Sequence, residues 1–243
     1  VITGGTHGNE YTGVYLLQRL ALREAEMRQA YPSIAVETLL ANPRAHAENR
    51  RFLEDDLNRM FTKEQLSAPS PTSYEQKRAQ EITGMLGPKG TGAAASVCID
   101  LHTTTSNMGC TLIVNTWSPL SIRAAAFVAG EWATESAAAE ADGRPPLAPF
   151  FVMLADGDTQ ESSPHVCSVA RDGLEIECGP TPQGLVRADV VASMDCAVRL
   201  LLRYFDLLHA GKAPTPPETL EVYVDKGKIS FLEFEGGVRD GSS

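Results

Sequence analysis

The stretch VCIDLH, at residues 97–102, is a short apolar run that is typical of a strand buried inside a sheet. Similar β-rich runs occupy residues 34–41, 110–114, 150–154 and 174–178. Segments with the apolar spacing of helices lie around them, at residues 11–30, 73–86, 119–139 and 189–209. Strands that alternate with helices predict an α/β protein with a largely parallel sheet that helices cover on both faces.

The composition excludes several classes of protein. The chain has 243 residues, of which 43% are hydrophobic, so it can bury a full core. Its net charge of -10 argues against binding to nucleic acid, which needs clustered Lys and Arg. No apolar run approaches the length of about 20 residues that spans a bilayer. The five cysteines contain no CxxC pair, which favours a reducing compartment, the cytoplasm.

The proline-rich segment at residues 214–217 interrupts the alternation of strands and helices. Two short β-like runs follow it between residues 220 and 234. We therefore expect a main α/β domain at residues 1–212 and the start of a β-type unit at residues 213–243. The chain also begins without Met, directly before a Gly-Gly turn, so we expect both ends to be incomplete.

The first candidate site residues lie in the turn after the opening strand. In the sequence HGNE, at residues 7–10, the side chains of His7 and Glu10 can reach one ion. Zinc binds both ligand types, and a catalytic zinc site needs three protein ligands with one position left for water. Because the same spacing also occurs at the start of surface helices, a third ligand is required.

His102 is the candidate third ligand, because it ends the strand at residues 97–102. The carboxyl ends of parallel strands are where open α/β sheets build their sites. For an isolated residue, a histidine that caps a strand end in solvent is the more common interpretation. Asp100 points to the same side of the strand as His102, so we expect it to orient the His102 imidazole.

A carboxylate is embedded in the apolar strand of the segment LEIECGP, at residues 174–180. Burial raises the pKa of a carboxyl group, which suits a residue that takes a proton from water and passes it to a leaving amine. Glu175 and Glu177 share one face of the strand, so periodicity does not distinguish them. The adjacent Gly-Pro turn favours Glu177 as the general acid/base.

Arginines flank acidic residues in the segment RRFLEDDLNR, at residues 50–59. Guanidinium groups bind carboxylates through two parallel hydrogen bonds, so such a loop can hold an acidic substrate. A solvated loop of surface ion pairs is the alternative interpretation. The candidate metal ligands elsewhere in the chain favour the substrate-binding interpretation.

Nine motifs follow one another along the chain: GGTHGNE (4–10), NPRA (42–45), DLNR (56–59), YE (74–75), GPK (87–89), DLH (100–102), TTSNMG (104–109), GPTPQG (179–184) and RAD (187–189). Together they resemble the aspartoacylase family of zinc deacylases, which are relatives of the zinc carboxypeptidases. The resemblance implies a zinc-carboxypeptidase-like fold with a mixed, largely parallel sheet, followed by a truncated C-terminal β unit.

The resemblance also implies a reaction. One zinc ion per chain would be bound by His7, Glu10 and His102. Glu177 would be the catalytic acid/base that works on the metal-activated water. The substrate would be a small N-acyl amino acid, which is hydrolysed to a free amino acid and a small carboxylate such as acetate. Since the family is commonly oligomeric, a homo-oligomer is among the expected partners.

Three residues of the arginine-rich segment are assigned to the substrate by the same resemblance. Arg51 would polarise the amide carbonyl of the substrate and stabilise the oxyanion that forms there. Asn58 and Arg59 would hold the α-carboxylate.

The sequence departs from aspartoacylases in the segment before the Glu177 strand. Aspartoacylases have a Tyr and an Arg there that bind the side chain of aspartate, and this chain has Ser163 and Cys167. The surrounding residues resemble the aminoacylase-3 branch, which acts on N-acetylated aromatic amino acids and on mercapturates. Arg171 is an alternative cation for an acidic substrate. Thr103 replaces an Asn that usually follows the metal-binding His.

Three alternative functions stay open at this stage. The first is aspartoacylase activity on N-acetyl-aspartate, and the second is a carboxypeptidase-like peptidase. The third is an inactive homologue that keeps the metal, because the family continues into a β-domain with a substrate-binding Tyr that Tyr223 does not match. The four intact residues of the zinc chemistry favour an active hydrolase.

Overall fold

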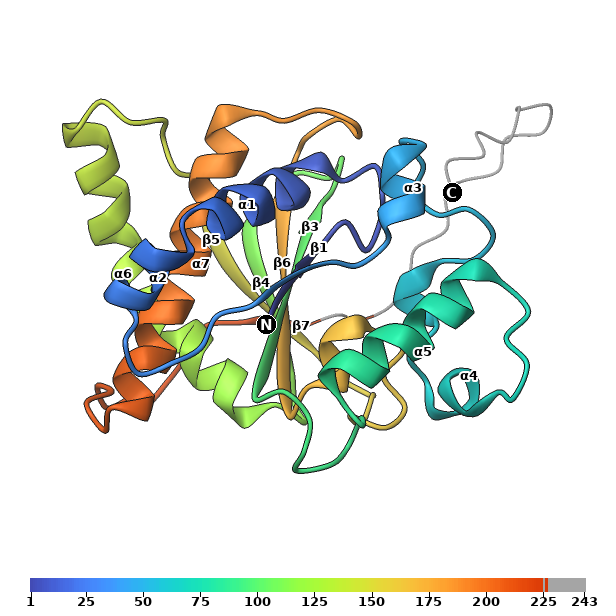
Figure 1. The fold of residues 1–243 in the computed structure, drawn as a ribbon. Helices are drawn as coiled ribbons and strands as arrows, with labels where there is room; N and C mark the ends of the chain where they lie inside the picture. The colour runs from blue at the N-terminus through green and yellow to red at the C-terminus, as the bar shows by residue number, and fades with distance from the viewer. Residues whose placement is uncertain (225, 227–243) are drawn as a thin grey trace.

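A computed structural model describes residues 1–224 and residue 226 of the chain. Among these residues, seven strands form one sheet in the order β2-β1-β3-β6-β4-β5-β7 (Figure 1). The strands are β1 (Ile2–Gly4), β2 (Thr38–Leu40), β3 (Val97–Thr103), β4 (Gly109–Asn115), β5 (Phe150–Ala155), β6 (Asp172–Gly179) and β7 (Tyr223–Val224). Strands β4 and β6 pair antiparallel, and the other described neighbours pair parallel. The predicted mixed, largely parallel sheet is confirmed.

Helices cover both faces of this sheet, as predicted (Figure 1). One layer contains α1 (Tyr11–Leu22), α2 (Glu24–Ala30), α6 (Pro119–Ala141) and α7 (Ala188–His209). The other contains α3 (Pro43–Ala47), α4 (Lys63–Ser67), α5 (Tyr74–Leu86) and the 3-10 turns η1 (Leu57–Arg59) and η2 (Val166–Val169). Among the described residues, no helix combines the length and hydrophobicity that a bilayer crossing requires.

The alternation of side chains along the strands gives each face its own core. On the α1, α6 and α7 side, Leu101, Ile176 and Leu112 belong to a cluster that includes Met194 and Leu201 of α7. A smaller cluster on the opposite side packs α5, η1 and η2 together through buried residues that include Phe61, Ile82 and Val169. Asp100, His102 and Glu175 alternate with Leu101 and Ile176 along β3 and β6, so their side chains point to the face that carries the smaller cluster.

Two predicted elements differ from the observed ones. The helix expected at residues 11–30 is interrupted at Arg23, and α2 beyond it has no buried residue, so packing no longer requires a continuous helix. The strand expected at residues 34–41 contains only Thr38–Leu40, because β2 pairs on one side only, with a β1 strand of three residues. The β-like runs expected beyond β7 lie outside the described residues.

Capping residues mark the boundaries of two helices. The Ser73 side chain accepts a hydrogen bond from the backbone N–H of Gln76, which satisfies one of the free donors at the start of α5. Gly87 ends this helix. Helix α7 ends at His209, and Gly211 follows in the left-handed region with φ of 69°.

The parallel strands β1, β3 and β6 bring their carboxyl ends to one edge of the sheet. In the register of β3 and β6, Asp100 pairs with Glu175 and His102 pairs with Glu177. These four side chains point to the same face, which is the face covered by η2 and α5. The fold therefore gathers several ionisable groups on adjacent strands.

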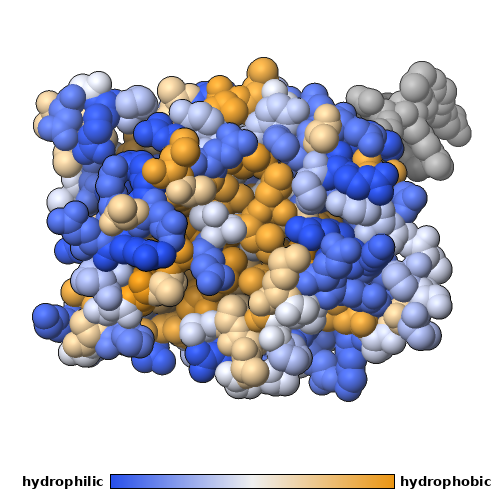
Figure 2. All heavy atoms as spheres, viewed as in Figure 1, coloured by the Kyte–Doolittle hydropathy of each residue, from blue (hydrophilic) through white to orange (hydrophobic). Residues whose placement is uncertain are grey.

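Hydrophobic residues are exposed across the middle of the face drawn in Figure 2, between the two helical layers. A groove of about 740 Å³ is lined by residues that include Ile2, Ile34, Val97 and Phe205. It lies at the amino ends of β1 and β3, at the opposite end of these strands from His102. The groove is thus separate from the cluster of ionisable groups.

Candidate metal centre and active site

The turn between β1 and α1 carries His7 and Glu10, and close backbone packing shapes it. A Cβ at Gly8 would lie 2.3 Å from the backbone of Ala45 and His46, so only glycine fits there. The backbone N–H of Glu10 donates to the His7 carbonyl at 3.1 Å, which closes the turn. The side chains of His7 and Glu10 consequently converge above the carboxyl end of β3.

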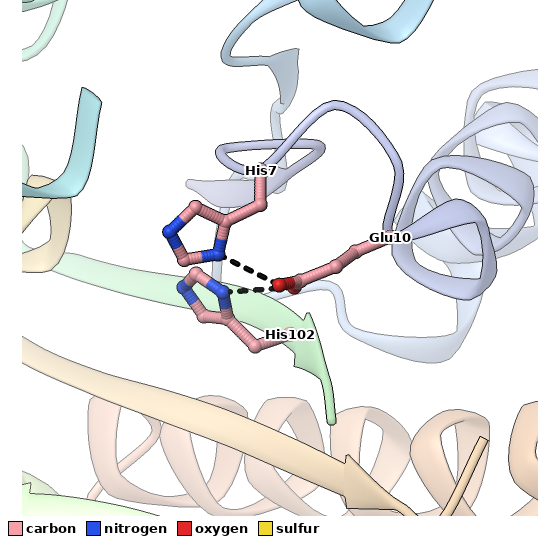
Figure 3. A group of neighbouring side chains, drawn as sticks. All are labelled: His7, Glu10 and His102. Carbon is pink, nitrogen blue, oxygen red and sulfur yellow. Dashed lines mark hydrogen bonds and ion pairs between the residues drawn. The ribbon is translucent and has the colours of Figure 1, made fainter. Parts of the chain in front are cut away.

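His7, Glu10 and His102 converge on one point, as Figure 3 shows. Glu10 Oε1 lies 2.7 Å from Nδ1 of His7, and Glu10 Oε2 lies 3.0 Å from Nδ1 of His102. The three donor atoms all lie within 4.8 Å of one another, and all three residues are buried. The structure thus brings together the three predicted ligands from distant parts of the sequence.

Asp100 holds the other nitrogen of His102, as the sequence predicts. Its Oδ2 lies 2.6 Å from Nε2 of His102, and the hydroxyls of Thr3 and Thr6 donate to its Oδ1 at 2.7 Å and 2.9 Å. Thr103 contributes through its backbone, since its N–H donates to Glu10 Oε2 at 2.9 Å. The side-chain difference at Thr103 therefore leaves this hydrogen bond intact.

The arginine-rich loop lies against the same cluster. Arg51 Nη1 is 3.3 Å from Glu10 Oε1, and its Nη2 is 3.6 Å from Asp56 Oδ2. Asp56 Oδ1 in turn lies 3.1 Å from Nε2 of His7. Arg51 is one-third exposed at its side chain, with 34% of its surface accessible, so it borders both the cluster and solvent.

Ionisation of the cluster follows from these contacts. Burial opposes the charge on Glu10, but His102 and His7 outweigh it and lower the pKa of Glu10 to about 2. Burial also opposes charge on His102, yet Asp100 and Glu10 raise the pKa of that imidazole well above its usual range. The carboxylates of the cluster therefore favour positive charge on the neighbouring imidazole.

The donor set fits a divalent metal ion. Two imidazole nitrogens and one carboxylate are a ligand set of catalytic zinc, which leaves a fourth position for water. Each ligand is also held from behind: Asp100 contacts His102, Asp56 contacts His7, and the backbone of Thr103 contacts Glu10. Such outer contacts fix the orientation of metal ligands and raise their basicity.

Glu177 and Glu175 have opposite environments although they share one face of β6. Glu177 Oε1 is buried and accepts no hydrogen bond from the described residues. Burial raises the pKa of Glu177 to about 7, and the negative charges of Glu10 and Glu175 add to this effect. Burial has the same tendency at Glu175, but the His165 imidazole at 2.8 Å outweighs it and lowers the pKa of Glu175. The structure therefore distinguishes the two carboxylates.

Asn58 and Arg59 lie in η1, next to the segment that leads into β6. Asn58 is buried, and its Oδ1 accepts from the backbone N–H of Val166 at 3.0 Å. Arg59 is exposed, and its Nη1 donates to the Asn58 carbonyl at 2.8 Å. One residue thus anchors the loop and the other presents a cation to solvent.

The residues that depart from the aspartoacylase pattern present no cation beside the cluster. Ser163 and Cys167 are both buried, and the Cys167 Sγ lies 3.7 Å from Glu175 Oε1. Arg171 is exposed at the start of β6 and bonds to the Ser96 hydroxyl at 2.6 Å. It is separated from Glu177 by most of the strand.

Two residues without a predicted role support the site. Glu75 is buried, and its carboxylate accepts from the backbone N–H groups of Leu53, Glu54 and Asp55 at 2.8 Å, 3.2 Å and 3.2 Å. It thereby fixes the loop that carries Arg51. Asp56 orients His7. Glu75 belongs to the motif YE and Asp56 to the motif DLNR, but their contacts depend on residues far away in the sequence.

The fold and the buried cluster define an α/β protein with a candidate metal centre at the carboxyl ends of its parallel strands. Residues 1–205 match the model of the succinylglutamate desuccinylase/aspartoacylase catalytic domain. The chain belongs to this family, and the resemblance predicted from the motifs is confirmed.

Individual relatives lie in two branches of the family. N-acyl-aromatic-L-amino acid amidohydrolase (carboxylate-forming) B of Danio rerio is 40% identical over 213 residues, which are 86% of this chain and 63% of the relative. Aspartoacylase of Rattus norvegicus is 35% identical over 97% of this chain and 71% of the relative. The fold matches murine aminoacylase 3 with a TM-score of 0.76 and 30% identity, over 98% of this chain and 73% of that one. The chain spans slightly less than two thirds of the zebrafish relative.

Proposed function

We propose that this protein is a zinc-dependent amidohydrolase that cleaves the amide bond of N-acyl amino acids. The observation that carries this proposal is the position of Glu177, which is the register neighbour of the candidate ligand His102 on the adjacent strand, and burial raises the pKa of this carboxyl group to about 7. An acid/base whose pKa lies near neutrality can both accept and return a proton at physiological pH. Family membership and the two named relatives support the same reaction class.

Each residue of the cluster has a defined role in this proposal. His7, Glu10 and His102 would hold one zinc ion, which supplies Lewis acidity and lowers the pKa of a water molecule. Glu177 takes the proton of the attacking water and later donates it to the departing amine nitrogen. Oε1 of Glu177 accepts no hydrogen bond from the described residues, so no group among them competes with a water molecule for this oxygen.

The arginine-rich loop binds the substrate in this proposal. Arg51 borders the cluster, which supports a role for its guanidinium as the donor to the carbonyl oxygen when negative charge develops there. Asn58 and Arg59 hold the α-carboxylate, since Arg59 is an exposed cation one residue from the buried Asn58. Glu75 keeps this loop in place through three backbone hydrogen bonds.

We assign the substrate class to N-acetylated aromatic amino acids or mercapturates. Ser163 and Cys167 are buried and neutral, and Arg171 is bonded to Ser96 at the far end of β6, so these positions supply no cation for a substrate side chain. The zebrafish relative is named for N-acyl-aromatic amino acids. The second candidate is cleavage of N-acetyl-aspartate, which the similarity to rat aspartoacylase favours.

A substrate panel tests the proposal. The purified protein is loaded with zinc and incubated with N-acetyl-tyrosine, an N-acetyl S-cysteine conjugate and N-acetyl-aspartate, and the free amine is measured. Faster release from the first two substrates supports the assigned class, whereas a preference for N-acetyl-aspartate supports the second candidate. Absence of release from all three, with zinc bound, would support an inactive homologue that keeps its metal.

The cellular setting is also part of the proposal. All five cysteines are buried and free, which fits a reducing compartment such as the cytoplasm. The partner is the small-molecule substrate, and a homo-oligomer is expected from the family. Light scattering of the purified protein measures the oligomeric state directly.

A further inference from the structure

A second group of potential metal ligands lies near the first and plays no part in the proposed reaction. It consists of His165, Cys167 and Glu175, whose donor atoms lie within 4.8 Å of one another. Glu175 projects from β6, and the other two residues flank the start of η2. We propose that these three side chains form a second site for a soft divalent metal ion such as zinc.

The distances suit one small ion. Glu175 Oε1 is 2.8 Å from Nδ1 of His165 and 3.7 Å from Sγ of Cys167. Zinc bonds of 2.0 to 2.3 Å at tetrahedral angles separate ligand atoms by roughly 3.5 Å, so the observed distances bracket that value. Imidazole, thiolate and carboxylate are the three side-chain types that bind zinc in proteins, and the thiolate selects against magnesium and calcium.

The local charge favours a cation at this position. Glu175 is buried and pairs in register with Asp100, another buried carboxylate. Glu177 lies on the same face of β6, two residues further along. Since a buried carboxylate is costly without a compensating charge, an ion bonded to Glu175 would stabilise this group of acidic side chains more strongly than the imidazole alone.

The backbone holds the ligands in place. A Cβ at Gly173 would lie 2.2 Å from the carbonyl oxygen of Cys167, so glycine allows η2 to pack directly onto β6. The hydroxyl of Ser168 donates to the His165 carbonyl at 2.6 Å, and the N–H of Val166 donates to Asn58. These contacts therefore hold the ligand residues in position before an ion binds.

Access and proton balance are both compatible with binding from solvent. The His165 side chain has 26% of its surface exposed, whereas Cys167 is fully buried behind it. Binding breaks the S–H bond of Cys167, releases one proton to solvent and forms a metal–sulfur bond. The imidazole of His165 changes tautomer, its proton passing through solvent from Nδ1 to Nε2, and its hydrogen bond to Glu175 is replaced by one metal bond to each residue. No electron is transferred.

The second site shares no ligand with the first. His7, Glu10 and His102 form one set, and Glu175 of the second set lies two residues before Glu177 on β6. Asp100 lies between them, because it contacts His102 and is the register neighbour of Glu175. A mutation can consequently remove a ligand of one site without removing a ligand of the other site.

Titration of the metal-free protein with Co²⁺ tests this site. Two ions per chain are expected, together with a thiolate-to-cobalt charge-transfer band in the near ultraviolet. Cys167→Ser should bind one ion and lose this band. Cys196→Ser is the matched control, because it replaces another buried cysteine, on α7, and should keep both ions and the band.

Two further variants separate the sites and guard against misfolding. His102→Ala should lose one ion yet keep the charge-transfer band, whereas His165→Ala, at a partly exposed residue, should keep one ion and weaken the band strongly. Wild-type protein that binds a single Co²⁺ ion without a thiolate band would overturn the second site. Persistence of the band in Cys167→Ser would overturn it equally.

Discussion

Asp100 Oδ2 lies 2.6 Å from Nε2 of His102, on the opposite side of the imidazole from the nitrogen that faces Glu10. The two residues are separated by one position on β3, so their side chains share a face of the sheet. This contact fixes which nitrogen of His102 is available to a metal ion. It also couples the ligand to the hydroxyls of Thr3 and Thr6, which hold Asp100.

Asp100→Asn is expected to lower zinc affinity by about 10- to 100-fold, because the amide no longer raises the basicity of His102 or fixes its ring. The dissociation constant is measured by competition with a chromophoric chelator. Asp195→Asn, on the outer part of α7 where Asp195 pairs with Arg199, should leave the affinity unchanged. Equal affinity of Asp100→Asn and the wild type would contradict the orienting role.

His102→Ala is expected to remove one equivalent of bound zinc, because only two of the three ligands of the first centre remain. The zinc content of the dialysed protein is measured by atomic absorption. His209→Ala replaces an exposed histidine at the end of α7 and serves as the matched control, with no loss of zinc expected. Retention of the full zinc content in His102→Ala would exclude His102 as a ligand.

Glu177→Gln is expected to lower turnover of the preferred substrate by about 10²- to 10⁴-fold, because the amide can neither accept nor return a proton. Zinc content should stay at the wild-type level, since Glu177 is not in the ligand set. Glu140→Gln, at an exposed position of α6, should keep full turnover. Near-normal turnover of Glu177→Gln would assign the acid/base role to another group.

The pH dependence of stability in the metal-free protein offers an independent test of Glu177. Its pKa is about 7 in the folded protein and 4.5 ordinarily, so the folded state binds this proton more tightly than the unfolded state does. The stability that results is present below about pH 4.5 and is lost as the pH rises to about 7, by up to about 3 kcal/mol.

Glu177→Gln stays neutral, so its free energy of unfolding relative to the wild type should rise across this interval and be constant above about pH 7. Urea unfolding of both metal-free proteins at a series of pH values measures the difference. Groups with lowered pKa values, such as Glu10 and Asp56, change the stability of both proteins alike and largely cancel. A difference that does not depend on pH would argue against a raised pKa.

Gly8→Ala is expected to destabilise the protein by about 1 to 3 kcal/mol, because its Cβ would lie 2.3 Å from the backbone of Ala45 and His46. The shift of the turn should also weaken zinc binding at His7. Gly84→Ala is the matched control, since nothing lies within 4 Å of its Cβ and alanine favours helix α5 by about 0.5 to 1 kcal/mol. Urea unfolding measures both, and equal stability of the two variants would contradict the close approach at Gly8.

Much of the architecture is predictable because local patterns carry it. The apolar run at residues 97–102, the cap at Ser73 and the stop at Gly211 reflect preferences of neighbouring residues, and all three appear in the structure. The break at Arg23 and the short β2 strand were not predicted. Both depend on how much of each segment contacts the rest of the molecule, which is not a local property.

The sequence by itself determined the α/β class and which side chains are candidate metal ligands, because strand and helix periodicity and the types of side chain are local properties of the chain. Only the tertiary structure decided that His7 and His102 meet at Glu10, since parallel pairing of β1 and β3 brings their carboxyl ends to one edge. It also gives Glu175 and Glu177 different environments. Strand periodicity treats these carboxylates alike, but an imidazole from another segment holds Glu175 ionised, whereas Glu177 is half-buried and its buried Oε1 accepts no hydrogen bond from the described residues.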